Sequence, residues 1–167
     1  GKIYFREKEI TGLIPDRITR MGIARTFQNI RLFQDLTVLE NVMVAQHHSI
    51  SSGGQAARWF IKSVTRIGYS VKEREMKEKA LNLLKVLGIE GLANDKSGSL
   101  SYGAQRLLEI ARAMATGASL LLLDEPAAGM NASETAQLVH TIRKIRNDFN
   151  LTVLLIEHDM KLVMGLC

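Results

Sequence analysis

The sequence is nearly free of cysteine and has no long hydrophobic run. Its one cysteine, Cys167, is the last of 167 residues, which excludes a disulfide or a cysteine metal site within the chain. No apolar run approaches the roughly 20 residues that span a bilayer, so any membrane role is expected to be peripheral or through a partner. Residues 1–10 alternate charged and apolar side chains, a pattern that predicts no cleavable signal.

The excess of positive charge is modest. The formal net charge is +5, and the sequence is 46% apolar and 23% charged, which is ordinary for one globular domain with room for two lobes. Such a charge permits contact with acidic lipid headgroups or nucleic acid, but a mildly basic enzyme has the same balance. The sequence starts at Gly1 without a methionine, so we expect it to be a piece of a longer chain.

Three short apolar segments are predicted to be strands, over residues 23–28, 120–123 and 152–156. Asn131 and Glu134 can cap the helix between the last two, which makes a strand–helix–strand unit. Such a unit has parallel strands and a right-handed crossover, so the carboxyl ends of both strands meet at one edge of the sheet. We therefore expect an α/β fold with a parallel-sheet core.

Polar side chains stand where these strands end: Gln28 at the first, Asp124 and Glu125 at the second, and His158 after the third. Ligands of open α/β sheets bind in the crevice at this edge. An adjacent pair of carboxylates there can hold Mg²⁺ and steer a water molecule. The polar turn Leu100–Gln105, which opens a helix, can bind an anion such as phosphate. Phosphate chemistry is therefore the first hypothesis.

The long stretch between the first two predicted strands is predicted to be helical. Thr37 and Glu40 form a capping box for one helix, and residues 72–87 have the clearest helical period. Ser101 is a good N-cap for a further helix over residues 105–114.

Residues 37–118 are therefore expected to form a helical lobe inserted into a nucleotide-binding core of residues 1–36 and 119–167. Within the lobe, Ser51–Gly54 is predicted to be a flexible break. The basic side chains that follow at spacing four, from Arg58 on, fit either a helix that touches a membrane surface or the solvated edge of a small lobe.

The order and spacing of these residues resemble the motifs of the ATP-binding subunits of ABC transporters, over nearly the whole chain. The resemblance implies a P-loop NTPase-like (RecA-like) core with an inserted helical subdomain. Gln28 fits the Q-loop, and Leu100–Gln105 fits the signature motif, although Tyr102 and Ala104 depart from the commonest form of that motif. Leu120–Asp124 fits Walker B, Ala127–Asn131 fits the D-loop, and His158 fits the switch histidine.

A narrower resemblance is to the branched-chain amino acid importers, some of whose relatives handle urea and short amides. It implies that ATP hydrolysis drives uptake of such solutes. The resemblance rests on Arg25–Gln28, Arg31–Phe33, the Tyr102 signature, Pro126–Asn131 and Ile156–Met160.

One motif of the family is absent from the sequence. The phosphate loop (Walker A), Gly-x-x-x-x-Gly-Lys-Ser/Thr, does not occur, since Ile3 follows Gly1-Lys2 where Ser or Thr is required. Comparison with the family places Gly1 after this loop, so the core is expected to be N-terminally truncated. We expect the isolated chain to bind ATP weakly or not at all. Exposed sheet faces and an unpaired strand edge should favour its aggregation.

The resemblance also implies catalytic roles for single residues, in a head-to-tail dimer with two ATP molecules at its interface. Glu125 would orient or deprotonate the attacking water, Gln28 would contact the metal or the water, and His158 would sense the γ-phosphate. Asp124 would hold Mg²⁺ through water.

The signature turn would serve the nucleotide of the opposite subunit. Ser101 and Gly103 would offer donors to its γ-phosphate, and Tyr102 and Gln105 are further cofactor-binding candidates in the same turn. The implied cofactors are ATP and Mg²⁺. The implied partners are permease transmembrane subunits, a second ATP-binding subunit and, indirectly, a periplasmic or extracellular solute-binding protein, with no nucleic acid. The implied location is peripheral, on the cytoplasmic face of the cell membrane.

Two alternatives stay open. A non-transport ABC ATPase of DNA repair or translation would need coiled-coil or nucleic-acid-binding segments, and neither appears between Gln28 and Leu100. The other alternative is a truncated fragment that no longer hydrolyses ATP and serves as a binding module.

Overall fold

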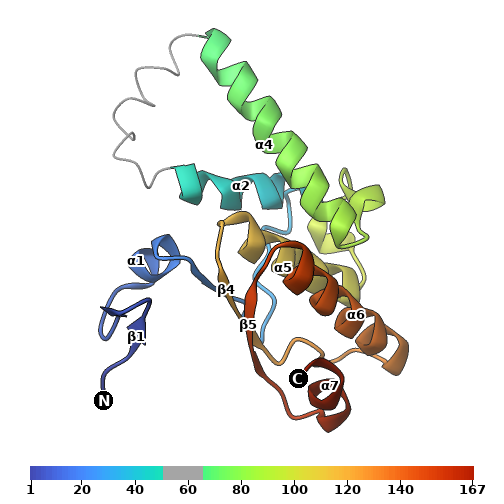
Figure 1. The fold of residues 1–167 in the computed structure, drawn as a ribbon. Coiled ribbons are helices and arrows are strands. Elements are labelled where there is room, and N and C mark those ends of the chain that lie inside the picture. The colour runs from blue at the N-terminus through green and yellow to red at the C-terminus, as the bar shows by residue number, and fades with distance from the viewer. Residues whose placement is uncertain (51–65) are drawn as a thin grey trace.

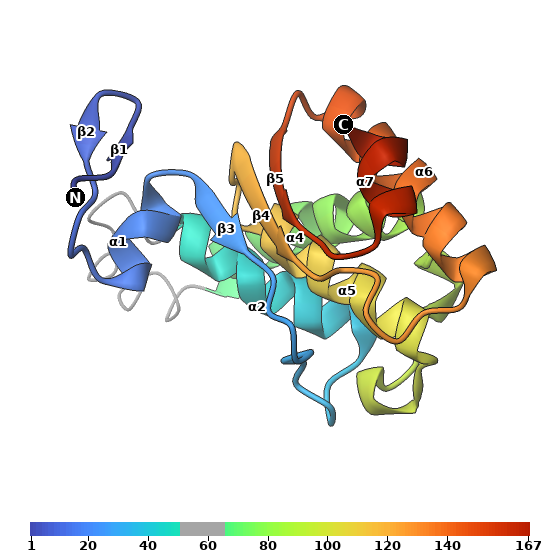
Figure 2. The ribbon, with the colours of Figure 1, turned by 90° about the horizontal axis from the view of Figure 1, so that it is seen from below.

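The computed structural model describes residues 1–50 and 66–167 (Figure 1). A parallel sheet in the order β3-β4-β5 lies at its centre, with helices packed against it. A small antiparallel hairpin, β1 paired with β2, lies apart from this sheet (Figure 2). The elements are β1 (Tyr4–Phe5), β2 (Lys8–Glu9), α1 (Pro15–Arg20), β3 (Ile23–Arg25), α2 (Val38–Ile50), α4 (Arg66–Val86), the 3₁₀ turns η2 (Glu90–Leu92) and η3 (Ser97–Ser99), α5 (Tyr102–Ala115), β4 (Leu120–Asp124), α6 (Ala132–Asp148), β5 (Thr152–Ile156) and α7 (Met160–Leu166).

β4 is the central strand of the parallel sheet. Leu120 pairs with Ile23 of β3 on one side and with Thr152 of β5 on the other. The parallel pairing of β4 with β5, joined by α6, confirms the predicted strand–helix–strand unit. The helix also starts as predicted, because Asn131 and Glu134 form a complete capping box.

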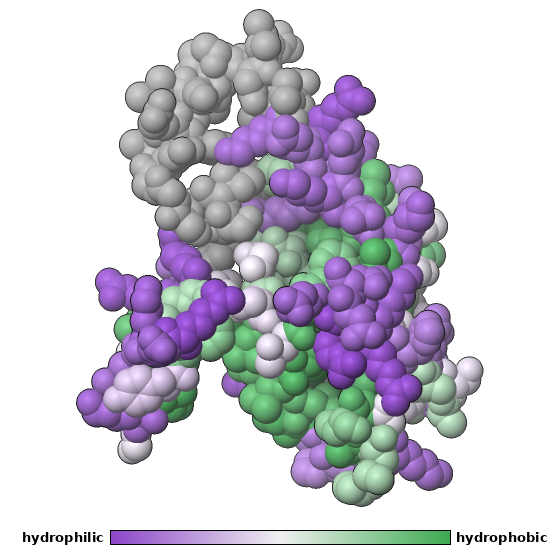
Figure 3. All heavy atoms as spheres, viewed as in Figure 1, coloured by the Kyte–Doolittle hydropathy of each residue, from purple (hydrophilic) through white to green (hydrophobic). Residues whose placement is uncertain are grey.

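The two faces of this sheet have different surroundings. Leu121 and Leu123 are only 1% exposed and share the hydrophobic core with Leu108 of α5. On β5, Leu154 and Ile156 are 56% and 53% exposed. Figure 3 shows hydrophobic surface gathered over β4 and β5 on this side. The strands are thus apolar on both faces, as the sequence indicates, and one of these faces stays open.

Helices α2, α4 and α5 pack on one another beside the sheet (Figure 1). The capping box at the start of α2 is confirmed, because the Thr37 N–H donates to Glu40 Oε2 at 2.8 Å and the Glu40 N–H donates to Thr37 Oγ1 at 3.2 Å. The apolar stripe predicted for residues 72–87 is confirmed as an inward face, since Met76, Ala80, Leu83, Leu84 and Leu87 are buried.

None of the helices in the described part of the chain has both the length and the apolar character that crossing a bilayer requires.

The first strand of the parallel sheet is shorter than the sequence predicts. β3 ends at Arg25, and after the Thr26 N–H donates to the Leu122 carbonyl at 2.9 Å the chain leaves the sheet. Gln28 therefore lies in a loop rather than at the end of the strand. The predicted break at residues 51–54 and the basic side chains from Arg58 lie outside the described residues.

Candidate functional site

Gln28, Glu125 and His158 come together at the carboxyl edge of the sheet. Gln28 Nε2 donates to Glu125 Oε2 at 2.8 Å, and His158 Nε2 lies 3.2 Å from Glu125 Oε1. The carboxylate thus has one neighbour at each oxygen. The parallel strand–helix–strand unit predicts the meeting of Glu125 and His158, and Gln28 was expected to join them from the end of another strand. The structure brings the three side chains together, although Gln28 lies in a loop.

Glu125 adopts a backbone conformation that non-glycine residues rarely occupy, with φ at 44°. Its N–H donates to the Ile156 carbonyl at 2.9 Å, which anchors this turn to the end of β5. Backbone strain of this kind clusters at sites where the surrounding structure fixes a functional side chain. The geometry therefore holds the Glu125 carboxylate at the sheet edge instead of leaving it on a freely solvated turn.

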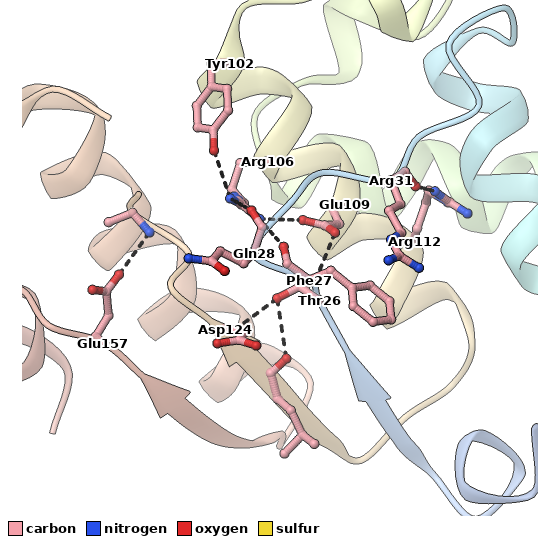
Figure 4. A network of polar contacts seen from close by, with 12 residues as sticks. Thr26, Phe27, Gln28, Arg31, Tyr102, Arg106, Glu109, Arg112, Asp124 and Glu157 are labelled. Atoms are coloured by element: carbon pink, nitrogen blue, oxygen red, sulfur yellow. Dashed lines mark hydrogen bonds and ion pairs between the residues drawn. The ribbon is translucent and has the colours of Figure 1, made fainter. Parts of the chain in front are cut away.

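Asp124, the last residue of β4, is held by Arg25 and Thr26 of the neighbouring segment. Its Oδ2 accepts from Arg25 Nη2 at 2.6 Å. Its backbone N–H donates to the buried Thr26 hydroxyl at 3.4 Å (Figure 4). Asp124 and Gln28 carry oxygen donors, the kind that Mg²⁺ prefers, so their chemistry fits that ion. The described residues form no group of three or more His, Cys, Asp or Glu side chains suited to a metal.

The loop after β5 is tied to the loop after β4 by a residue that the sequence analysis passed over. Glu157 Oε2 accepts from the backbone N–H of His158 at 3.0 Å, and its Oε1 accepts from that of Ala127 at 3.0 Å. The imidazole of His158 itself is exposed, at 86% for the side chain. Glu157 thus fixes the backbone of His158 while the ring stays accessible. In the sequence, only the position of Glu157 next to His158 indicates a role for it at this site.

The signature candidates lie at the start of α5. Ser101 is the N-cap of α5, as predicted, because its hydroxyl accepts from the Ala104 N–H at 3.4 Å. Gln105 Nε2 donates to the Leu100 carbonyl at 3.1 Å and so closes the turn. Within the described part of the chain, these side chains make no hydrogen bond to Glu125.

Tyr102 and Gly103 pack against the D-loop stretch and the start of α6. A Cβ atom on Gly103 would lie 3.3 Å from Glu134 Oε1, and one on Gly129 would lie 3.3 Å from the Tyr102 ring. These approaches leave little room for a side chain at either glycine. The signature turn and the D-loop stretch are thus packed directly on each other.

Polar side chains on one face of α5 bind the loop that carries Gln28 (Figure 4). Arg106 donates to the carbonyls of Phe27 at 2.7 Å and Gln28 at 2.9 Å. Glu109 accepts from the Phe27 N–H at 3.1 Å. Neither residue is among those that the sequence predicts for the site. The pattern that indicates them is the spacing of three from Arg106 to Glu109 and on to Arg112, which puts charged side chains on one face of the helix.

Arg112 holds the far end of the same loop. Its Nη1 donates to the Arg31 carbonyl, and its guanidinium lies over the Phe33 ring, 4.9 Å from the centroid. Burial lowers the pKa of the Arg112 guanidinium below its ordinary value, and the charge of Glu109 acts in the opposite direction. Helix α5 therefore anchors the loop from Phe27 to Arg31 at both ends.

Sequence comparison gives this arrangement a family context. The family model described as ABC transporter matches residues 1–128. The chain is 45% identical over 166 residues to the high-affinity branched-chain amino acid transport ATP-binding protein LivG of Salmonella typhimurium, in an alignment that covers 99% of this chain and 63% of that protein. The chain thus spans about 63% of the length of this relative.

Two solved structures resemble the fold closely. The crystal structure of a nucleotide-free ATP-binding cassette from an ABC transporter is 31% identical with a TM-score of 0.78, over 99% of this chain and 62% of that one. A dimeric, post-hydrolysis ATP-binding cassette bound to ADP and Pi is 25% identical with a TM-score of 0.73, over 99% of this chain and 66% of that one.

Proposed function

The chain belongs to the ABC transporter family, and on this premise we propose that the complete protein is the ATP-binding and ATP-hydrolysing subunit of an importer. The observation that carries the proposal is the contact of Glu125 with both Gln28 and His158. A carboxylate flanked by an amide and an imidazole, at the ligand-binding edge of an α/β sheet, is suited to orient a water molecule and accept its proton.

Glu125 is the proposed general base of hydrolysis, a role that contributes about 10²–10⁴-fold to a rate. His158 would contact the γ-phosphate, because its exposed imidazole can turn from Glu125 toward a ligand. Gln28 would contact the attacking water from the other side. Since phosphoryl transfer depends mainly on positioning and charge stabilisation, these three groups need correct placement more than unusual reactivity.

Asp124 and Gln28 are the proposed Mg²⁺ ligands. When bound, the ion would neutralise charge on the triphosphate oxygens. Asp124 is already fixed by Arg25 at 2.6 Å, so its carboxylate need not be ordered by the ion. The residues proposed to contact the nucleotide of a second subunit are Ser101, Tyr102, Gly103 and Gln105. The dimeric state of the cassette bound to ADP and Pi supports the association of two such subunits.

The assembly that we propose has two ATP-binding subunits on permease transmembrane subunits, at the cytoplasmic face of the cell membrane, with a solute-binding protein acting indirectly. Residues 37–118 would form the helical subdomain, between core residues 1–36 and 119–167. The similarity to LivG, a branched-chain amino acid transport ATP-binding protein, supports branched-chain amino acids as the transported class, with related amides or urea as the next candidates.

The test is ATP hydrolysis by the complete protein with its permease partners, before and after Glu125→Gln. The amide keeps the shape of the side chain but cannot take a proton, so we expect turnover to fall by about 10²-fold or more while ATP-dependent dimerisation survives. Glu75→Gln, on the exposed side of α4, makes the same chemical change away from the site and should leave turnover unchanged. Normal turnover in Glu125→Gln would refute the assigned role.

A further inference from the structure

Arg106 and Glu109 form a buried ion pair on α5. The side chain of Arg106 is 0% exposed and that of Glu109 is 7% exposed, and Arg106 Nη1 lies 2.8 Å from Glu109 Oε2. The two residues are three apart in the sequence, so they project from the same face of the helix. Figure 4 shows both side chains directed at the loop that follows β3.

Stability alone explains this pair poorly. Removing two charges from water costs free energy that their attraction often fails to recover, and apolar replacements of similar volume are frequently neutral or stabilising. Arg106 carries a further cost, because its buried Nε has no hydrogen-bond partner among the described residues. The position of the pair therefore calls for a reason beyond packing.

That reason is the backbone that the pair holds. Glu109 accepts from the Phe27 N–H, while Arg106 donates to the carbonyls of Phe27 and Gln28. Both polar groups of residue 27 and the carbonyl of residue 28 are thus bound by one turn of one helix. With these groups fixed, the Gln28 side chain reaches Glu125 at 2.8 Å although β3 has already ended.

The same guanidinium also contacts the signature turn. Arg106 Nη2 donates to the Tyr102 hydroxyl at 3.0 Å, and the ring of Tyr102 packs against Gly129. The Tyr102 position is one where this sequence departs from the commonest signature motif. One side chain therefore joins the backbone of Gln28 to the surface that would face a second subunit.

We propose that Arg106 and Glu109 are positioning residues for hydrolysis: they fix Gln28 against Glu125 and link its placement to Tyr102 at the start of α5. This inference rests on the proposed function. Neither residue touches the reacting atoms, so both act through Gln28. The pair should then affect the rate of the chemical step more than the affinity for ATP.

The experiment is a double-mutant cycle in the complete protein, with Glu109→Gln, Gln28→Ala and the double variant. Glu109→Gln leaves Arg106 without its charge partner, and we expect kcat to fall by about tenfold or more with KM for ATP changed less than about twofold. In the Gln28→Ala background, Glu109→Gln should lower kcat by less than about a further twofold, because the side chain that Glu109 helps to position is no longer there.

Losses that multiply in the double variant, or an unchanged kcat in Glu109→Gln, would overturn the inference. Glu78→Gln is the matched control, because it breaks the exposed Arg74–Glu78 pair on α4 and should leave kcat and KM unchanged. The melting temperature of every variant is measured in parallel, so that a loss from partial unfolding is recognised.

A milder variant keeps the test decisive if Glu109→Gln does not fold. Tyr102→Phe removes only the hydroxyl that Arg106 binds, and its effect on kcat should also vanish in the Gln28→Ala background; multiplying losses would again refute the link. Failure of the proposed function would give a different result: the unaltered complete protein would not hydrolyse ATP, or Glu125→Gln would hydrolyse it normally.

Discussion

Arg25 of β3 and Asp124 of β4 form an ion pair across the parallel sheet, with 2.6 Å between Nη2 and Oδ2. Asp124 is also a proposed Mg²⁺ ligand, so the positively charged guanidinium of Arg25 lies beside the carboxylate to which the metal would bind. The side chain of Arg25 is 54% exposed, which lets it move aside at small cost. The pair keeps the carboxylate ordered while no cation occupies the sheet edge.

Replacing Arg25 by Met should therefore strengthen Mg²⁺ binding at Asp124. The variant removes the competing charge, and we expect half-saturation of ATP hydrolysis by the complete protein at a Mg²⁺ concentration lower by about two- to fivefold, in line with the strength of an exposed ion pair. A Mg²⁺ titration of nucleotide binding by calorimetry should shift in the same direction. Arg74→Met is the control. A higher Mg²⁺ requirement in Arg25→Met would instead mean that the arginine orients the ligand.

Glu40 should make stability depend on pH. The N–H and hydroxyl of Thr37 bond to its carboxylate and lower its pKa from the ordinary value of 4.5. A depressed folded-state pKa stabilises the fold above the unfolded-state value, and this contribution disappears as pH falls through the folded-state value. The melting temperature should therefore exceed that of Glu40→Gln at neutral pH, and the difference should close as the pH falls through the lowered folded-state pKa of Glu40. A difference that stays the same at acidic pH would contradict this explanation.

The start of α6 offers a test of helix capping. Asn131 accepts from the N–H groups of Ser133 and Glu134, both at 3.0 Å. Asn131→Ala leaves these donors without their acceptor, and we expect a loss of about 1 kcal/mol in the free energy of unfolding, measured by chemical denaturation. Asn131→Asp should retain most of the stability. Asn147→Ala, in the last turn of the same helix, is the control; an equal loss there would contradict the capping explanation.

Local patterns in the sequence were sufficient to predict the edge where Glu125 and His158 meet. The apolar strands and the cap at Asn131 define a strand–helix–strand unit, and because its two strands are parallel their carboxyl ends lie at the same edge of the sheet. Gln28 reached the predicted place by a different route, because β3 ends at Arg25 and side chains of α5 then hold the loop. The meeting of Glu125 with His158 was predictable because it follows from the topology of the sheet. The path of the loop that carries Gln28 was not predictable, because it depends on contacts with α5.

The buried pair on α5 shows the limit of such prediction. An arginine followed three residues later by a glutamate is usually a solvated helix pair, and charged side chains are rarely fully buried. Arg106 and Glu109 are buried because the loop from Phe27 lies across them, which depends on contacts almost 80 residues away in sequence. Only the spacing of three with Arg112 distinguishes this face beforehand.

The open face of the sheet should govern how the described chain behaves in solution. Leu154 and Ile156 stand more than half exposed on β5, beside hydrophobic surface on β4 (Figure 3). Contiguous apolar surface of this kind, next to a strand edge, favours self-association. We therefore expect the 167-residue chain to bind a hydrophobic dye and to form concentration-dependent aggregates in light scattering.

The matched variants of this last prediction act on the open face alone. Leu154→Thr with Ile156→Thr places β-branched side chains, which suit a strand, at both positions and makes the face polar, so dye binding and aggregation should both decrease. Leu155→Thr, on the half-buried side of the same strand, should destabilise the fold and increase aggregation instead. Equal aggregation in the double variant and the unaltered chain would show that another surface drives association.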